Sequence, residues 1–88
     1  MRVRIPTPLR SYTAGAANVT AEGATVGELL ADLDRQFPGI RFRMVDEQGQ
    51  VRQHMVVWLG QERCRDLAAP VTGFDEVVIM QALSGGAS

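Results

Sequence analysis

Two consecutive glycines near the carboxyl terminus, Gly85 and Gly86, form the residue pattern in this chain that most clearly suggests chemistry. Glycine has no Cβ, so a diglycine can pass through a narrow channel and adopt backbone dihedrals that other residues disfavour. The apolar run 76–83 precedes the pair and has the composition of a strand. This order predicts a small domain that presents its own backbone terminus to the active site of another protein. A Gly/Ser-rich end can also be an incidental tail, and both interpretations stay open at this point.

The composition is that of one ordinary globular domain. The chain has 88 residues, of which 45% are hydrophobic and 22% are charged, and its formal net charge is −1. That charge gives no reason to expect a nucleic-acid partner, and no apolar run reaches the roughly 20 residues that span a bilayer. The first residues lack the apolar stretch of a signal peptide, and Cys64 is the one cysteine. We therefore expect a cytoplasmic protein with no membrane partner and no internal disulfide.

All nine basic residues are arginine, and the chain contains no lysine. A GC-rich genome explains this bias, because Ala, Gly and Val are abundant as well. It also has a chemical consequence. Without a side-chain amine, the chain cannot be extended into lysine-linked polymers of itself.

The first third of the chain predicts a β-hairpin. Residues 2–10 alternate basic and apolar side chains, which is the pattern of a strand with Val3 and Ile5 facing inward. Residues 14–17 read as a turn, and residues 18–22 as a short return strand.

A helix is predicted to begin at Thr25, because Thr25 and Glu28 have the spacing of a capping box. Pro38 and Gly39 should end it. The side chains predicted to form its buried stripe are Val26, Leu29, Leu30, Leu33 and Phe37. Those predicted to face water are Glu28, Asp32, Asp34 and Arg35.

The second half of the chain predicts three more strands. Residues 40–45 favour an irregular or short helical connection, and residues 54–59 are a β-rich run. Trp58 is expected in the lower core, although a tryptophan near a turn can also anchor a partner. Residues 62–65 can pair back across a turn, and residues 76–83 form the last strand.

This order of elements predicts an α+β protein with a β-grasp (ubiquitin-like) fold. A mixed four- to five-stranded sheet would pack on one main helix, with the first and last strands parallel and side by side in its middle. Residues 1–83 would form the domain. Residues 84–88 would form a flexible tail with the diglycine and a two-residue extension.

Three stretches carry a resemblance to a known family: the opening VRIPTPLR at 3–10, the helix TVGELLADL at 25–33, and the ending FDEVVI at 74–79 followed later by the diglycine. Over nearly its whole length the chain resembles the sulfur-carrier (MoaD/ThiS) branch of the ubiquitin-like proteins. The opening is most similar to the cysteine-biosynthesis type.

The resemblance implies a carrier that serves enzymes rather than an enzyme. An E1-like adenylyltransferase and sulfurtransferase would use ATP and Mg²⁺ to adenylate Gly86, and a thiocarboxylate would form there. A sulfur-accepting enzyme, such as a pyridoxal-phosphate (PLP)-dependent sulfhydrylase, would then use the sulfur for cysteine or a related amino acid, a thiosugar or a similar metabolite. The carrier itself would have no catalytic residue, no metal and no tightly bound cofactor.

Two residues after the diglycine, Ala87 and Ser88, depart from this pattern. As written, the terminal carboxylate belongs to Ser88 and not to Gly86. By resemblance to relatives with a short extension, we expect a JAMM-type zinc metalloprotease to cleave between Gly86 and Ala87. The alternative is that both residues are a remnant of expression.

Partner recognition is expected on the sheet face opposite the helix. By similarity to ubiquitin, Val77 and Ile79 would belong to the core while the alternate residues of the last strand face outward. The predicted partner-binding patch comprises Val57, Val78, Met80, Ala82 and Leu83. These side chains could instead be ordinary half-buried strand residues.

Two other function classes remain open. The first is a ubiquitin-like modifier conjugated to target proteins through Gly86, and the second is a non-covalent β-grasp interaction module. His54 and Cys64 lack neighbours in sequence that would make a catalytic pair or a metal site.

Overall fold

The opening segment forms the predicted hairpin. In the computed structural model, which describes residues 1–82, strand β1 (Arg2–Arg4) pairs antiparallel with strand β2 (Asn18–Thr20). Val3 and Ile5 are fully buried, as the alternation predicts.

Two prolines limit the length of β1. The last backbone bond across the hairpin runs from the Ile5 N–H to the Ala17 carbonyl, at 2.8 Å. Pro6 and Pro8 have no N–H to donate, so the ladder stops there. The chain continues as a short 3-10 helix, η1 (Thr7–Leu9).

The main helix begins where the capping pattern predicts. Helix α1 (Val26–Gln36) has Thr25 as its N-cap, and the Thr25 hydroxyl accepts a hydrogen bond from the Glu28 N–H at 3.2 Å. The Glu28 carboxylate accepts from the Ala24 N–H at 2.9 Å, one residue before the cap. The predicted apolar stripe is buried over the helix, and Phe37 at its end packs partly buried against the core.

A glycine with a left-handed backbone joins the two helices. Gly39 has a φ of +96°, which a residue with a Cβ adopts only with strain, and it lets the chain turn sharply after α1. Helix α2 (Ile40–Met44) follows directly. The expectation of a short helical connection here is confirmed.

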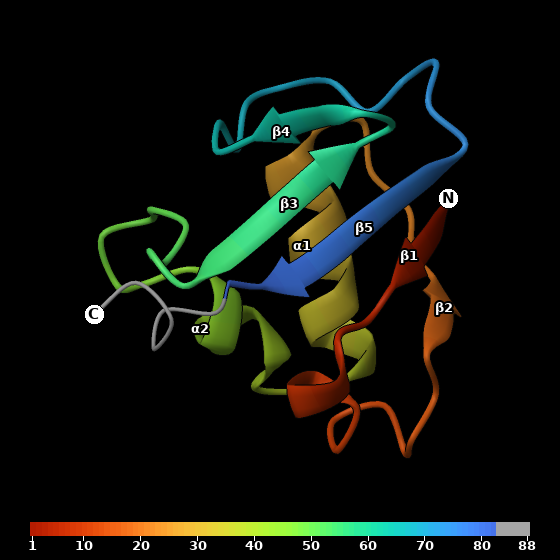
Figure 1. The fold of residues 1–88 in the computed structure, drawn as a ribbon, viewed down its shortest axis with the longest axis vertical. Helices are drawn as coiled ribbons and strands as arrows, with labels where there is room; N and C mark the ends of the chain where they lie inside the picture. The colour runs from red at the N-terminus through yellow and green to blue at the C-terminus, as the bar shows by residue number, and fades with distance from the viewer. Residues whose placement is uncertain (83–88) are drawn as a thin grey trace.

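The remaining strands complete a five-stranded sheet. These are β3 (Met55–Leu59), β4 (Glu62–Cys64) and β5 (Glu76–Gln81), and the strand order is β2-β1-β5-β3-β4 (Figure 1). β1 and β5 are parallel neighbours, while the other pairs are antiparallel. The predicted β-grasp topology is confirmed.

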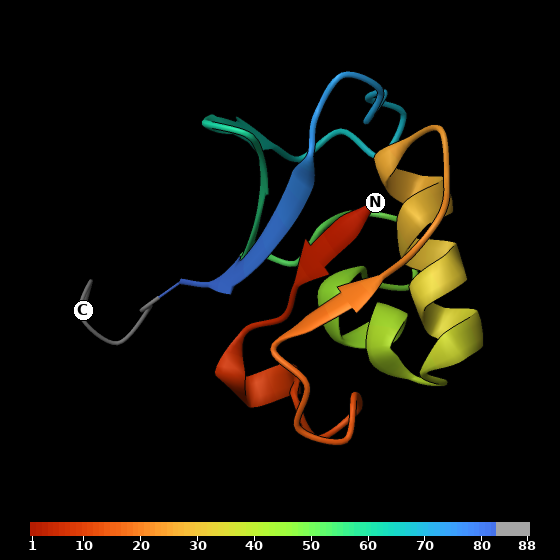
Figure 2. The ribbon, with the colours of Figure 1, turned by 90° about the vertical axis from the view of Figure 1, so that its right-hand side faces the viewer.

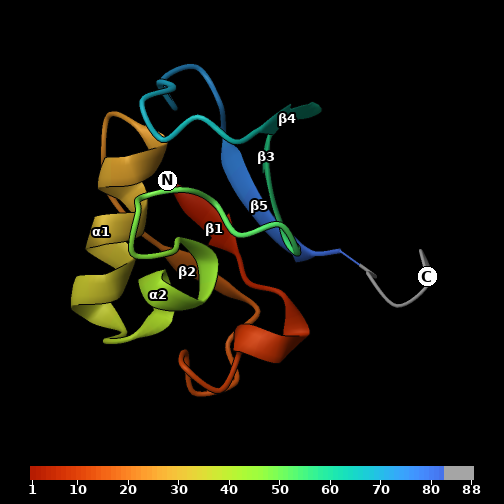
Figure 3. The same cartoon turned by 90° about the vertical axis from the view of Figure 1, so that its left-hand side faces the viewer.

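Both helices cover the same face of the sheet. Figures 2 and 3 show the sheet from its two edges, with α1 and α2 on one side and no helix or strand of residues 1–82 covering the other. The buried core lies between the sheet and the helices. Its largest fully buried side chains are Ile5, Leu29, Leu30, Leu33, Ile40, Met44, Met55 and Ile79.

The prediction that Asp32 faces water is wrong. Asp32 is only 9% exposed, and its carboxylate accepts from the Glu22 N–H at 2.9 Å and from the Gln36 side-chain amide at 3.0 Å. Arg35 pairs with its other oxygen. Asp32 lies at the edge of the apolar stripe, where the connection from β2 to α1 passes and brings an amide that needs an acceptor. The carboxylate therefore ties this connection to the helix.

We expect Asp32→Ala to lower the free energy of unfolding by about 1–3 kcal/mol, because the Glu22 amide loses its acceptor in a partly buried place. Chemical denaturation measures this directly. Asp75→Ala is the matched control, since Asp75 is exposed and should change stability by less than about 0.5 kcal/mol. Equal effects of the two substitutions would contradict this role for Asp32.

Candidate protein-interaction site

Strand β5 divides its side chains between the two faces of the sheet. Val77 and Ile79 are at most 1% exposed and face the helices, while Met80 is 49% exposed. Val78 shares the face of Met80 by the two-residue period of a strand. The predicted alternation along β5 is confirmed. Val78 and Met80 lie on the face that no helix covers.

The prediction that Val57 belongs to this face is wrong. Val57 is fully buried and pairs with Ile79, which faces the core. In an antiparallel pair, directly opposite residues share a face. The residues opposite Val78 and Met80 are Trp58 and Val56.

Sequence reasoning therefore missed two residues of the outer face, Val56 and Trp58. It placed Trp58 in the lower core, yet Trp58 is half-buried between Val78 on one side and Arg63 on the other. Every residue of β3 is apolar, so the run has no alternation that distinguishes its faces. The register with β5 supplies that information.

Together these side chains form an apolar surface on the sheet, which we call the outer patch: Val56, Trp58, Val78, Met80 and Ala82. A hollow of about 210 Å³ lies over the part of the patch formed by Val56, Trp58, Met80 and Ala82. Arg4 pairs with Val78 and Arg63 pairs with Trp58, so an arginine stands at each side of the apolar row. An apolar centre bordered by arginine is typical of protein interfaces.

A second hollow, which we call the exit groove, adjoins the end of β5. It has a volume of about 390 Å³ and lies between η1 and residues 79–82. Arg4 and Arg10 line it together with Pro6 and Pro8. The Ala82 N–H donates to the His54 carbonyl at 2.6 Å, so the sheet holds the chain as far as the last described residue.

A tight turn after α2 is organised by Asp46. Its carboxylate accepts from the N–H groups of Gln50 and Gln48, at 3.0 and 2.9 Å. The pKa of Asp46 is lowered from 3.8, chiefly by the hydrogen bond from Gln50 and to a smaller extent by the charge of Arg52. The turn leads the chain back to Arg52, beside Phe42.

Arg52 is anchored against α2. Its Nε donates to the Phe42 carbonyl at 2.8 Å, and its guanidinium carbon lies 4.7 Å from the centroid of the Phe42 ring. We call the surface formed by Phe42, Arg43, Arg52 and His54 the Phe–Arg corner, and it encloses a hollow of about 300 Å³.

The remaining predicted site residues are placed as follows. Leu83, Gly85, Gly86 and Ala87 lie outside the described residues. Cys64 is partly buried, and its thiol donates to the Asp66 carbonyl at 3.4 Å.

Among residues 1–82, no three histidine, cysteine or acidic side chains come together in a way that could hold a metal ion. In the same part of the chain, neither helix has the length and apolar composition needed to cross a membrane.

Known proteins share both the sequence pattern and the fold of this chain. The sequence model of the ThiS family matches residues 3–86. The sulfur carrier protein CysO of Mycobacterium tuberculosis is 34% identical over 89 residues, which cover 96% of this chain and 96% of that protein. The crystal structure of Mycobacterium tuberculosis CysO has a TM-score of 0.86 at 32% identity, covering 93% of this chain and 98% of the other.

Two further solved structures share the fold. A chain of the Amycolatopsis orientalis BexX/CysO complex has a TM-score of 0.85 at 34% identity, covering 93% of this chain and 94% of that one. SAMP1 from Haloferax volcanii has a TM-score of 0.75 at 27% identity, with 98% of both chains covered.

The two faces of the sheet predict unequal losses of stability when a residue is replaced by Asp. Val57→Asp buries a charge in the core and should cost about 4 kcal/mol of unfolding free energy, whereas Met80→Asp on the outer patch should cost less than about 1 kcal/mol. Chemical denaturation of the two variants compares them under identical conditions. Similar losses in both would contradict the assignment of faces.

Proposed function

Because the chain belongs to the ThiS family and is a sulfur carrier rather than an enzyme, we propose that it carries sulfur as a thiocarboxylate on Gly86. The carboxylate of Gly86 becomes available after Ala87 and Ser88 are removed. The observation that carries this proposal is the extent of the family match, which runs through both glycines, ends at Gly86 and leaves the last two residues out.

The chemistry needs a free carboxylate at Gly86 and an activating partner. A Gly86 oxygen attacks the α-phosphate of ATP, held with Mg²⁺ by an E1-like enzyme, and pyrophosphate leaves. Sulfide then attacks the Gly86 carbonyl carbon, the bond to AMP breaks, and the thiocarboxylate remains. Every atom of this exchange is supplied by ATP, sulfide and the chain terminus. No side chain of the carrier takes part.

The described domain contributes recognition and positioning. The outer patch offers apolar area bordered by Arg4 and Arg63, and it lies on the strand that leads directly to the tail. A partner that covers the patch therefore lies close to the point at which the tail begins. The likeness to a chain of the BexX/CysO complex supports a carrier that works by docking to a partner protein.

The identity with CysO supports cysteine or a related amino acid as the destination of the sulfur. The acceptor in this proposal is a PLP-dependent sulfhydrylase, and a JAMM-type zinc metalloprotease removes the last two residues. ATP and Mg²⁺ belong to the activating enzyme, and the carrier binds no cofactor of its own.

The requirement for a free Gly86 is tested by charging two forms of the chain in vitro. The 88-residue chain and a chain ending at Gly86 are each incubated with the adenylating enzyme of the source organism, ATP, Mg²⁺ and sulfide. Mass spectrometry should find the exchange of one oxygen for one sulfur only in the Gly86-terminated chain.

A chain ending at Gly85 is the matched control and should stay uncharged. Equal charging of the 88-residue chain would overturn the need for processing. If the Gly86-terminated chain gains no sulfur, the thiocarboxylate itself is overturned. Gly-Gly remnants on lysines of other proteins would instead indicate conjugation.

The outer patch is tested by Met80→Asp in the Gly86-terminated chain. We expect adenylation to fall about 30-fold, the effect of losing a contact worth about 2 kcal/mol at an interface centre. Pyrophosphate release measures the rate. Thr72→Asp, an exposed position in the turn before β5, should leave the rate unchanged. Wild-type rates in Met80→Asp would remove the patch from the proposal.

A further inference from the structure

The Phe–Arg corner lies outside the core and takes no part in the proposed chemistry at Gly86. Phe42 is 55% exposed although it lies on α2, whose neighbours Ile40 and Met44 are fully buried. Leaving a large aromatic side chain in water gains nothing for stability. An exposed aromatic beside arginine is the composition of residues that dominate binding at interfaces.

The arginines of the corner are free to bind an anion. Arg52 uses its Nε on the Phe42 carbonyl, so the structure fixes the guanidinium while its terminal nitrogens remain available. Within residues 1–82, the ion pairs involve Met1, Arg2 and Arg35 on the basic side, and neither Arg43 nor Arg52 belongs to one.

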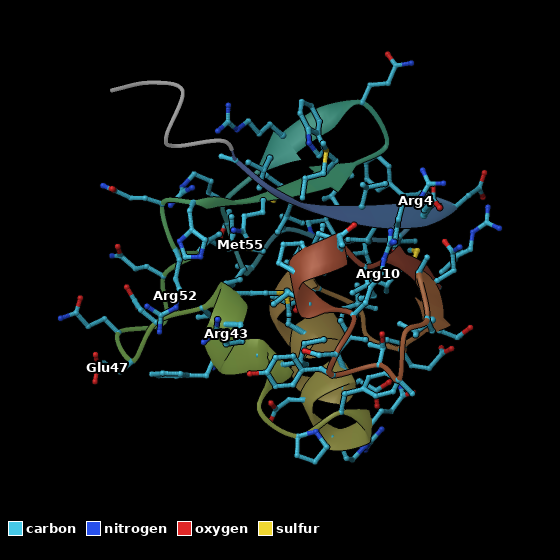
Figure 4. All side chains as sticks on the ribbon, turned by 60° about the horizontal axis from the view of Figure 1, so that its bottom comes forward. Arg4, Arg10, Arg43, Glu47, Arg52 and Met55 are labelled. Atoms are coloured by element: carbon cyan, nitrogen blue, oxygen red, sulfur yellow. The ribbon has the colours of Figure 1, made fainter. Side chains whose placement is uncertain are left out.

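The two nearby acids, Asp46 and Glu47, do not line the hollow of the corner. Asp46 keeps its negative charge near Arg52, while its carboxylate accepts from two backbone amides of its own turn. Glu47 lies at the tip of that turn, beyond Arg52 and Arg43 in Figure 4, and forms no ion pair within the described chain. The hollow of the corner is therefore lined by two arginines and by no acidic side chain, on a chain whose formal charge is −1.

The corner adjoins the place where the tail begins. His54 lines its hollow, and the carbonyl of the same residue accepts the Ala82 N–H. Figure 4 shows Arg43 and Arg52 on one side of the molecule and Arg4 and Arg10, which line the exit groove, on the other. An enzyme that binds the end of β5 therefore lies close to the corner.

We propose that the Phe–Arg corner binds a cluster of carboxylate side chains on the adenylating enzyme, as a second docking point beside the outer patch. This assignment rests on the proposed function and names the chemistry of the partner. A planar guanidinium fixed by its Nε suits a carboxylate, which it can meet with two parallel hydrogen bonds. Phe42 favours a protein over a free phosphate, because a protein also supplies apolar contact for the ring.

Binding of the carrier to the adenylating enzyme of the source organism tests the proposal by isothermal titration calorimetry. Arg52→Ala and Phe42→Ala should each raise Kd roughly tenfold, as expected for interface anchors. Arg2→Ala is the control, because Arg2 pairs with Glu76 at the opposite end of β5 and is 63% exposed. Melting temperatures check that every variant stays folded: Phe42 and Arg52 lie outside the core, so each substitution should lose only the contact between these two residues.

Two further measurements distinguish a carboxylate-binding corner from a phosphate site: the NaCl dependence of Kd and a titration of the free carrier with ATP–Mg²⁺. The Kd of the unchanged carrier should rise with NaCl more steeply than that of Arg52→Ala, because the variant has lost the charge pair. An unchanged Kd in Arg52→Ala would overturn the proposal. Saturable ATP–Mg²⁺ shifts of the Arg52 Nε–H signal in the free carrier would also overturn it, in favour of a phosphate site.

The result is independent of whether Gly86 is charged. If the enzyme binds the carrier through Arg52 but never adenylates it, the proposed function fails and the corner stands. If it adenylates the carrier and Arg52→Ala binds normally, the corner fails and the proposed function stands. If no binding is measurable, the corner is overturned as well.

Discussion

The central position of β5 is the constraint on which the rest of the structure depends. β5 pairs with β1 on one edge and with β3 on the other, so both rows of its backbone groups are satisfied and its side chains must divide between two faces. Val77 and Ile79 close the core, and Val78 and Met80 form the outer patch. A slip of one residue would exchange the two sets. The register that stabilises the fold is therefore the register that builds the recognition surface.

The same strand decides where the tail begins. Ala82 is still bonded to the sheet through the His54 carbonyl, and the exit groove and the Phe–Arg corner both adjoin that point. A carrier that delivers one reactive terminus benefits from a rigid origin for it, because a fixed starting point raises the effective concentration of the terminus at the partner's active site. The small helices support this arrangement indirectly. η1 lines the groove, and α2 provides Phe42.

The features that could be predicted from the sequence are those that depend on residues close together in the chain. The Thr25–Glu28 cap, the stripe of α1 and the alternation along β5 are all read from neighbouring residues, and the structure follows them. β3 could not be read in this way, because five apolar residues in a row leave the faces undefined until β5 sets the register. Asp32 required knowledge of a backbone amide ten residues away. The Phe–Arg corner brings together Phe42 on α2 and Arg52, ten residues later in the sequence. No local motif predicts that contact.

The intact mass of the carrier isolated from its source organism tests the central claim most directly, because it reads the end of the chain and the atom attached there in one measurement. The account predicts a chain that ends at Gly86, with a fraction heavier by the exchange of one oxygen for one sulfur. A chain that keeps Ala87 and Ser88 in every isolated form, with no sulfur added, would contradict it.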